Sequence, residues 1–145
     1  MGNLARMLQR RSPVVHPCAP DESVAVAVTL MSEQMVGVVP IIEGGQLIGV
    51  FSERDLLRRV IAPGLALEKI QLRDVMTPDP VTSTPGESRL VALHKMQVAG
   101  CRHLPIVAAA DGTVIDMLSL RDLLFDEIDE RKGEIEDLRR YIQGS

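Results

Sequence analysis

The sequence predicts an α+β fold made of two copies of one strand–helix–strand–strand–helix unit. Two recurring segments carry most of this prediction. Pro20–Ser23 recurs as Pro85–Ser88, and Ser52–Leu57 recurs as Ser119–Leu124, in the same order along the 145-residue chain. Self-similarity on this scale indicates a duplicated structural unit.

The first long helix of each unit is predicted over Ser23–Gln34 and Glu87–Gln97. In the second copy, good helix formers follow Ser88, and Gly100 ends the segment. In the first copy, alternating valines would by themselves indicate a strand. Because the two copies are expected to match, we favour a helix in both.

A β-hairpin follows each of these helices. The predicted strands, in chain order, are Gly37–Ile42, Gln46–Phe51, His103–Val107 and Thr113–Leu118. Their turns contain Gly44-Gly45 and Asp111-Gly112, and the turn in the second copy is longer. An insertion confined to a turn is expected of two copies of one fold.

Three segments lie outside the repeats. Asn3–Arg11 is predicted as a short amphipathic helix. Leu72–Met76 is predicted as a helical turn, after which Pro78 and Pro80 force an extended entry into the second repeat. We divide the chain into an N-terminal helical segment (1–13), a first repeat with its linker (14–71), a second repeat (72–130) and a C-terminal helical tail (131–145).

The charged tail is the third of these segments, and it carries apolar residues at helical spacing. They are Ile128, Ile135, Leu138 and Ile142. This spacing places them on one narrow face of a helix, which suits a partner helix or a neighbouring subunit. The alternative is that the face packs against its own domain.

The composition argues against several classes of protein. Aromatic residues make up 2% of the chain and the net charge is −4, which disfavours nucleic-acid binding. The most apolar stretch, Val24–Met31, is far shorter than the roughly 20 residues of a membrane span. Cys18 and Cys101 are isolated and suit free thiols, and no signal-peptide core is evident. We therefore expect a cytoplasmic protein with no membrane association.

Candidate binding chemistry lies where the second hairpin strand of each unit runs into a helix. After Gly49, the Ser52 hydroxyl and the Asp55 carboxylate lie together at a helix N-terminus, where unsatisfied N–H groups favour a phosphate. Ser52 can donate to a phosphate oxygen, and Asp55 can accept from both hydroxyls of a ribose. The alternative is a capping box that only satisfies backbone donors.

The repetition of this motif favours a ligand site over a simple cap. Ser119 and Asp122 occupy the same places in the second copy, and Arg54 and Arg121 match each other.

Two further basic residues, Arg102 and His103, stand before Leu104-Pro105, where adjacent cations can neutralise a phosphate. The matching residues of the first copy, Gly37 and Val38, are uncharged. One strongly basic cleft is therefore expected rather than two equal ones. The alternative is that Arg102 is an ordinary surface residue and that His103 makes a routine hydrogen bond.

The chain resembles a CBS-domain pair, also called a Bateman module, over 14–61 and 72–130. The most telling segments are GVFSERDLLRRV from Gly49 and CRHLPIV from Cys101. The resemblance implies two β-α-β-β-α units packed sheet to sheet in pseudo-two-fold symmetry. It also implies clefts that bind AMP, ADP, ATP or a related adenosyl ligand.

The resemblance also implies residue roles. Asp55 and Asp122 would bind ribose. The phosphate-binding candidates are Ser52, Arg54, Arg102, His103, Ser119 and Arg121. The adenine-binding candidates are Val15, Val81, Thr82, Pro105 and Ile106, with the alternative that the aliphatic ones among them are plain core residues. Asp116 stands where the family has glycine and would crowd or repel a phosphate, so the Asp55 site ranks above the Asp122 site.

The scattered histidines assemble neither a metal site nor a catalytic set, so we expect no enzyme activity and no required cofactor. The predicted function is a regulatory module that binds an adenine nucleotide and signals to an unidentified effector protein or through a homodimer formed by the repeats and the tail helix. The alternative is an assembly module that dimerises without a ligand.

Overall fold

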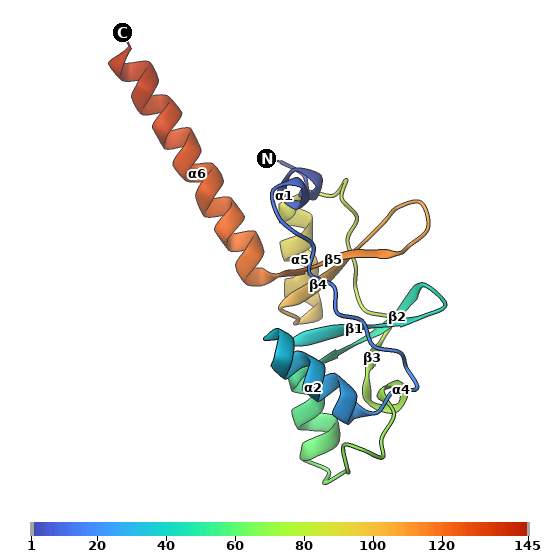
Figure 1. Ribbon diagram of the computed structural model, residues 1–145. Helices are drawn as coiled ribbons and strands as arrows, with labels where there is room; N and C mark the ends of the chain where they lie inside the picture. The colour runs from blue at the N-terminus through green and yellow to red at the C-terminus, as the bar shows by residue number, and fades with distance from the viewer. Residues whose placement is uncertain (1, 145) are drawn as a thin grey trace.

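The computed structural model describes residues 2–144, and Figure 1 shows two repeats whose hairpins meet near the middle of the molecule. The elements are α1 (Leu4–Gln9), α2 (Val24–Gln34), β1 (Val38–Glu43), β2 (Gln46–Ser52), α3 (Glu53–Asp55), the π-helix η1 (Leu56–Ile61), α4 (Leu72–Val75), β3 (Thr77–Pro78), α5 (Arg89–Ala99), β4 (His103–Val107), β5 (Val114–Ser119) and α6 (Leu120–Gln143). The predicted α+β class with two repeated units is confirmed.

Helix α2 settles the ambiguity of the alternating valines. The Ser23 hydroxyl caps the helix by accepting from the backbone N–H of Val26. The side chains of Val24, Ala27 and Met31 are buried, which is a helical spacing. The helix prediction is therefore confirmed, as it is for α5, which begins after Ser88 and ends at Gly100 with a φ of 69°.

The predicted first strand of each repeat is reduced to a single bridge. Cys18 pairs with Ile41, and Ser83 pairs with Ile106, both in parallel. Prolines flank both bridging residues, and a proline has no N–H to extend a ladder. The regular strands are therefore the two antiparallel hairpins, β1 with β2 and β4 with β5, together with the short β3 beside β2.

The short helices α1 and α4 exchange places: α1 precedes repeat one but packs on repeat two, and α4 precedes repeat two but packs on repeat one. Helix α1 contributes Leu4 to the core of repeat two, whereas α4 contributes Leu72 to the core of repeat one. Their backbone contacts correspond: Leu4 N–H donates to Glu87 O and Leu72 N–H donates to Glu22 O, both at 2.9 Å. The chain must therefore cross between the repeats twice, at residues 10–17 (the N-terminal crossing segment) and 76–82 (the linker crossing segment).

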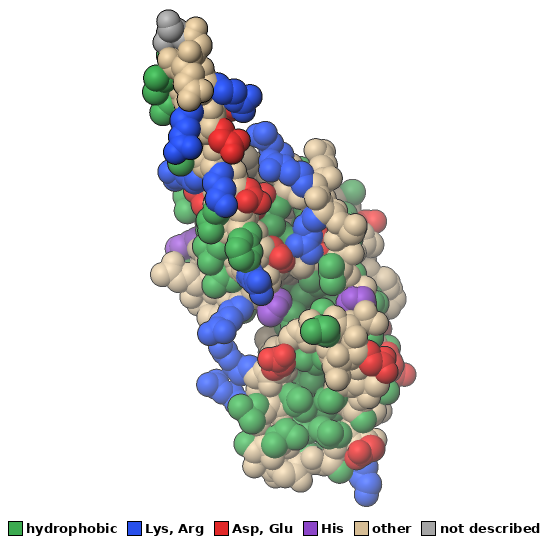
Figure 2. Space-filling view, turned by 60° about the vertical axis from the view of Figure 1, so that its left-hand side comes forward, with side chains coloured by type: hydrophobic (Ala, Val, Ile, Leu, Met, Phe, Trp, Pro, Cys, Tyr) green, Lys and Arg blue, Asp and Glu red, His purple; other side chains and the backbone are tan. Residues whose placement is uncertain are grey.

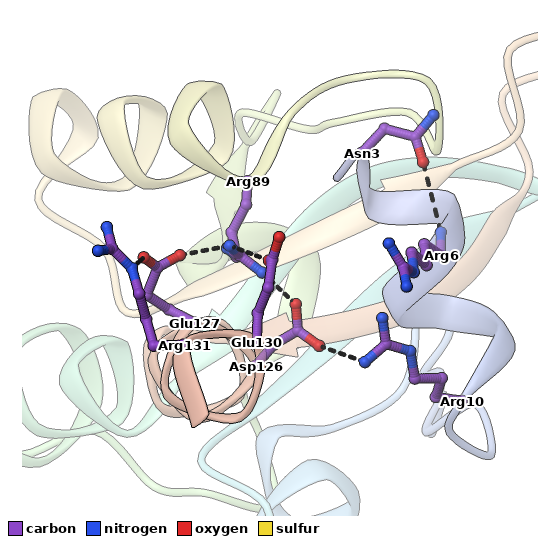
Figure 3. Close-up of polar contacts among 8 residues, drawn as sticks. All are labelled: Asn3, Arg6, Arg10, Arg89, Asp126, Glu127, Glu130 and Arg131. Carbon is purple, nitrogen blue, oxygen red and sulfur yellow. Dashed lines mark hydrogen bonds and ion pairs between the residues drawn. The ribbon is translucent and has the colours of Figure 1, made fainter. Parts of the chain in front are cut away.

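Helix α6 runs without a break from the end of β5 to Gln143 and so takes in most of the predicted tail, whose last residue lies outside the described residues. Figure 1 shows the helix projecting from the body. Its first turns are anchored by the buried Leu123 and by Arg89 of α5, whose side chain is 5% exposed. Figure 3 shows this guanidinium among the carboxylates of Asp126, Glu127 and Glu130. A buried charge needs such partners, so the cluster fixes the direction in which α6 leaves the body.

Candidate functional site

Two clefts open between the repeats, and each contains one of the predicted ribose-binding carboxylates. The Asp55 cleft has a volume of about 430 Å³ and is bordered by the linker crossing segment. The Asp122 cleft has a volume of about 970 Å³ and is bordered by the N-terminal crossing segment. Both volumes lie in the range of small-molecule sites.

In the Asp55 cleft, the carboxylate is already engaged by the protein. Asp55 is 6% exposed. Its Oδ2 accepts from the backbone N–H and the hydroxyl of Ser52, both at 3.0 Å, and its Oδ1 accepts from the Thr77 hydroxyl at 3.0 Å. Arg59 Nε lies 3.6 Å from Oδ1. A carboxylate has about four acceptor positions, so Asp55 has little capacity left for a diol.

Gly49 has a packing role in this cleft. A Cβ built at this position would lie 2.5 Å from Met76 Sδ and 2.9 Å from the Thr77 carbonyl oxygen. Glycine therefore allows β3 to pair with β2, and it brings Thr77 within reach of Asp55.

In the Asp122 cleft, the carboxylate is about a third exposed and less fully engaged. Oδ2 accepts from the Ser119 backbone N–H at 2.8 Å and from Arg11 Nη1 at 3.0 Å. Within residues 2–144, no hydrogen bond or ion pair reaches Oδ1. The Ser119 hydroxyl accepts from the Asp122 N–H at 3.0 Å, and a hydroxyl can turn its own proton toward a ligand. Both side chains can therefore still bind a ligand.

Asp116 does not line this cleft, so it does not crowd a phosphate there. It is 1% exposed and accepts from the backbone N–H of Val14 at 3.0 Å and of Met117 at 2.8 Å. Arg11 Nε lies 3.0 Å from Asp116 Oδ2, so one guanidinium bridges Asp116 and Asp122. Burial raises the pKa of Asp122, but the Ser119 and Arg11 hydrogen bonds outweigh it and lower that pKa below its usual value.

Arg102 and His103 line both clefts, so the expected basic pair is shared rather than confined to one site. Burial lowers the pKa of His103, partly offset by the carboxylates of Asp122 and Glu53, and the Arg102 charge lowers it further. His103 is therefore neutral at pH 7 and offers a hydrogen bond, not a second full charge. The cation at this shared wall is Arg102.

The other predicted phosphate residues divide between the clefts. Arg54 lines the Asp55 cleft and donates to the Gly100 carbonyl oxygen at the end of α5, at 3.1 Å. Arg121 lines the Asp122 cleft and lies over the Phe125 ring, 5.2 Å from its centroid. The arginines and carboxylates are balanced in the Asp55 cleft, two against two, whereas three arginines face one carboxylate in the Asp122 cleft.

The predicted adenine contacts are only partly brought together. Val81 and Pro105 line the Asp55 cleft, whereas Val15 and Thr82 line neither. Ile106 is fully buried in the core of repeat two, so it has no surface to offer a base.

Sequence reasoning missed three residues that matter for these sites: Arg11, His16 and Thr77, all on the crossing segments. Their roles depend on contacts with residues far away in sequence. Arg11, for example, reaches Asp116 and Asp122 across more than half the chain. The basic run Arg10-Arg11 before Pro13 was the one available signal.

The duplicated hairpin units and the paired inter-repeat clefts define a tandem CBS-domain protein. The CBS domain model matches residues 6–62 and 72–127, so the chain belongs to the CBS domain family and carries two copies of the domain. This confirms the resemblance seen in the sequence.

Among curated relatives, the mitochondrial CBS domain-containing protein CBSX3 of Arabidopsis thaliana is 32% identical over 132 residues. The match covers 88% of this chain and 63% of CBSX3, so the chain spans less than two thirds of that relative.

Two solved structures share the fold. The CBS domain protein NE2398 is 26% identical, with a TM-score of 0.79 and coverage of 87% of this chain and 97% of its own. Arabidopsis thaliana CBSX2 in complex with AMP is 24% identical, with a TM-score of 0.73 and coverage of 90% and 99%.

Within residues 2–144, no helix is both long enough and apolar enough to cross a membrane. The cytoplasmic location stays a prediction, and the relative CBSX3 is a mitochondrial protein.

Proposed function

We propose that this protein is a regulatory module that binds an adenine nucleotide, and that the Asp122 cleft is its principal site. The observation that carries the proposal is the partly exposed Asp122 carboxylate, with an uncommitted oxygen, in a cleft where three arginines face it. A nucleotide presents a diol and an anion, and this cleft offers an acceptor for the first and cations for the second. This proposal ranks the Asp122 cleft above the Asp55 cleft, the reverse of the ranking that the sequence suggested from Gly49 and Asp116.

Each group has a defined role in this proposal. Asp122 accepts from the ribose hydroxyls through Oδ1, while Arg11 stays on Oδ2 and neutralises Asp116. Arg102 and Arg121 bind the phosphate, and the Ser119 hydroxyl donates to it. The apolar wall formed by Val14, Val38 and Met117 packs against the base. The Asp55 cleft, with Val81 and Pro105, is a weaker second site.

Support from related proteins is consistent with this assignment. CBSX2, which shares the fold over almost its whole length, is known in complex with AMP. CBS-domain proteins are generally regulatory. We therefore also propose that this chain is not a catalyst, that it signals to an effector protein, and that it acts in the cytoplasm.

A second candidate function is assembly without a ligand. It is favoured by the saturated Asp55 and by the apolar side chains exposed on α6, among them Ile135 and Leu138. Under this candidate, the protein forms a homodimer and the clefts are vestigial.

Isothermal titration of the full chain with AMP, adenosine and 2′-deoxy-AMP tests the proposal. AMP should bind, and adenosine and 2′-deoxy-AMP should each bind at least about tenfold more weakly, because one lacks the phosphate and the other lacks half of the diol. The affinities of ADP and ATP, measured in the same series, show how many phosphate groups the cleft prefers. No binding by any nucleotide would reject this function and leave the assembly candidate. Equal affinities for AMP and 2′-deoxy-AMP would reject the role of Asp122.

A further inference from the structure

The outer half of α6 exposes apolar side chains that the body does not cover. From Arg131 to Gly144, every residue except Gly133 is exposed. The exposed fractions of Ile128, Ile135 and Leu138 are 46%, 51% and 60%. In Figure 2 this helix extends beyond the body as a column that carries apolar and charged side chains. We call the face defined by Ile128, Ile135 and Leu138 the α6 stripe.

The α6 stripe has the heptad order of a two-stranded coiled coil. With Ile128 at position a, Ile135 and Ile142 also fall on a, whereas Leu124 and Leu138 fall on d. Leu124 and Ile128 also border the Asp122 cleft, so the part of the stripe that lies clear of the body begins after them. A β-branched residue at a combined with leucine at d favours parallel dimers. The remaining d position holds Arg131, whose Nε donates to Glu127 on the same helix at 3.0 Å, so its charge is already partnered.

The charges beside the α6 stripe distinguish a parallel pair from an antiparallel one. The e positions carry Lys132 and Arg139, and the g positions carry Glu127 and Glu134. In a parallel pair, each g residue faces the following e residue of the other helix, so that opposite charges meet. In an antiparallel pair, g faces g and e faces e, so that like charges meet. Glu127 is already bound to Arg89 and Arg131 of its own chain, so the Glu134–Arg139 pair carries this distinction. Within residues 2–144, Glu134 and Arg139 make no ion pair.

The helix is already formed and directed before any partner arrives. The buried Leu123 and the Arg89 cluster hold its first turns on repeat two. Of the three carboxylates in the cluster, only Glu127 borders the α6 stripe, and Asp126 and Glu130 lie on the other side of the helix. Short isolated helices are marginal because nucleation is costly. Here the first turns of α6 are already folded on repeat two, so the cost of helix nucleation is met before association. Two such helices can therefore pair over fewer than three heptads.

We propose that α6 pairs with the α6 of a second copy of this chain in a parallel, two-stranded coiled coil along the α6 stripe. This arrangement specifies the homodimer named above as part of the proposed function, and it does not require a bound nucleotide. The pairing places both bodies at the same end of the seam.

Sedimentation equilibrium of the full chain tests the seam. The wild-type protein should be a dimer at micromolar concentration. The double variant Ile135→Ala/Leu138→Ala should raise the dimer Kd by about 100-fold or more, because both copies lose the buried side chains. The matched control Glu136→Ala/Arg140→Ala changes the outer face of the same turns and should dissociate like the wild type. A monomeric wild type, or a double variant that dimerises normally, would overturn the proposal.

A charge exchange tests the orientation. Glu134→Arg should weaken a parallel dimer by about threefold to tenfold, and adding Arg139→Glu should restore it, because the exchanged pair is again complementary. In an antiparallel dimer, position 134 would face a g position of the other copy, which carries the same variant, so Glu134→Arg would exchange one pair of like charges for another. A Glu134→Arg dimer that is not weakened, or that Arg139→Glu does not restore, would therefore refute the parallel arrangement. Circular dichroism confirms that each variant keeps its helix. An AMP titration of the same variants separates a failure of this seam from a failure of nucleotide binding.

Discussion

The Asp55 and Asp122 clefts are built from the same repeated unit, yet the segment that crosses each one is different. The linker crossing segment brings Thr77, a neutral donor, to Asp55. The N-terminal crossing segment brings Arg11, a cation, to Asp122. In the first cleft the carboxylate is buried and saturated, whereas in the second it keeps an open oxygen in a basic environment.

The difference begins at one pair of equivalent positions on the second hairpin strand. Gly49 has no side chain, so β3 lies close against β2. Asp116 has a carboxylate, and this carboxylate holds the backbone of Val14 and the guanidinium of Arg11. The Ser-x-x-Asp motif is identical in both copies and forms a capping box in both. The availability of the motif for a ligand is therefore decided by the crossing segment and not by the motif.

The strongest test of this comparison exchanges each aspartate for alanine. Asp122→Ala should weaken AMP binding by at least about 100-fold, because hydrogen bonds to a charged acceptor are worth about 1.5–3 kcal/mol each. Asp55→Ala should lower the free energy of unfolding, since it removes a capping box, but it should leave AMP affinity within about threefold. Isothermal titration well below the unfolding temperature measures both. A larger loss for Asp55→Ala would restore the ranking based on the glycine.

The role of Gly49 in packing predicts a change in stability without a change in binding. Gly49→Ala should lower the free energy of unfolding by about 2 kcal/mol, because the added methyl group overlaps Met76 and the Thr77 backbone. Gly86→Ala is the control, since no atom lies within 4 Å of a Cβ at that position. Urea denaturation compares the two variants. A loss of AMP affinity in Gly49→Ala at unchanged stability would instead place the ligand against β2.

The repeats and the regular elements could be predicted from local patterns. Ser23, Ser88 and Gly100 act as caps within a few residues of their partners, so the sequence alone identifies the helix ends. The crossing segments could not be predicted, because Arg11 pairs with residues of repeat two and Thr77 with Asp55 of α3, both far away in sequence. The buried Arg89 cluster was missed for the same reason: its three carboxylates belong to α6, far along the chain.

The sequence predicted most of the residues of the candidate site, but it did not predict how they are arranged. Ser119, Asp122, Arg121, Arg102 and His103 do line one cleft. The adenine contacts were less well predicted, because alternation along an extended segment turns neighbouring side chains in opposite directions. Val14 and His16 line the Asp122 cleft, whereas Val15 between them does not.

A substitution in the wall that the two clefts share should weaken AMP binding less than Asp122→Ala does. Arg102→Met should weaken AMP binding by about tenfold, because Arg102 lines the Asp122 cleft and no carboxylate within residues 2–144 pairs with it. Arg54→Met is the matched control, and it should change affinity by less than about threefold, since Arg54 caps α5 at the other cleft. Titration calorimetry at low and high salt checks both variants. Equal losses would mean that both clefts contribute equally to binding.

The smallest expected effect is a pH dependence carried by His103, which both clefts share. Burial lowers the pKa of His103, so as pH falls from about 6.5 the unfolded state takes up the proton first. The stability that neutral His103 contributes is thus complete above about pH 6.5, declines as pH falls toward the lowered pKa, and levels off below it.

Phosphate beside His103 favours its protonated form, so AMP affinity should rise a few-fold between pH 7.5 and pH 5.5 through this residue. The phosphate of AMP titrates in the same range, and His103→Gln isolates the contribution of the histidine. The wild type should gain more affinity on acidification than His103→Gln, and Asp122→Ala should remove the difference if the phosphate lies in the Asp122 cleft. Identical pH dependences in wild type and His103→Gln would show that the phosphate does not reach the wall between the clefts.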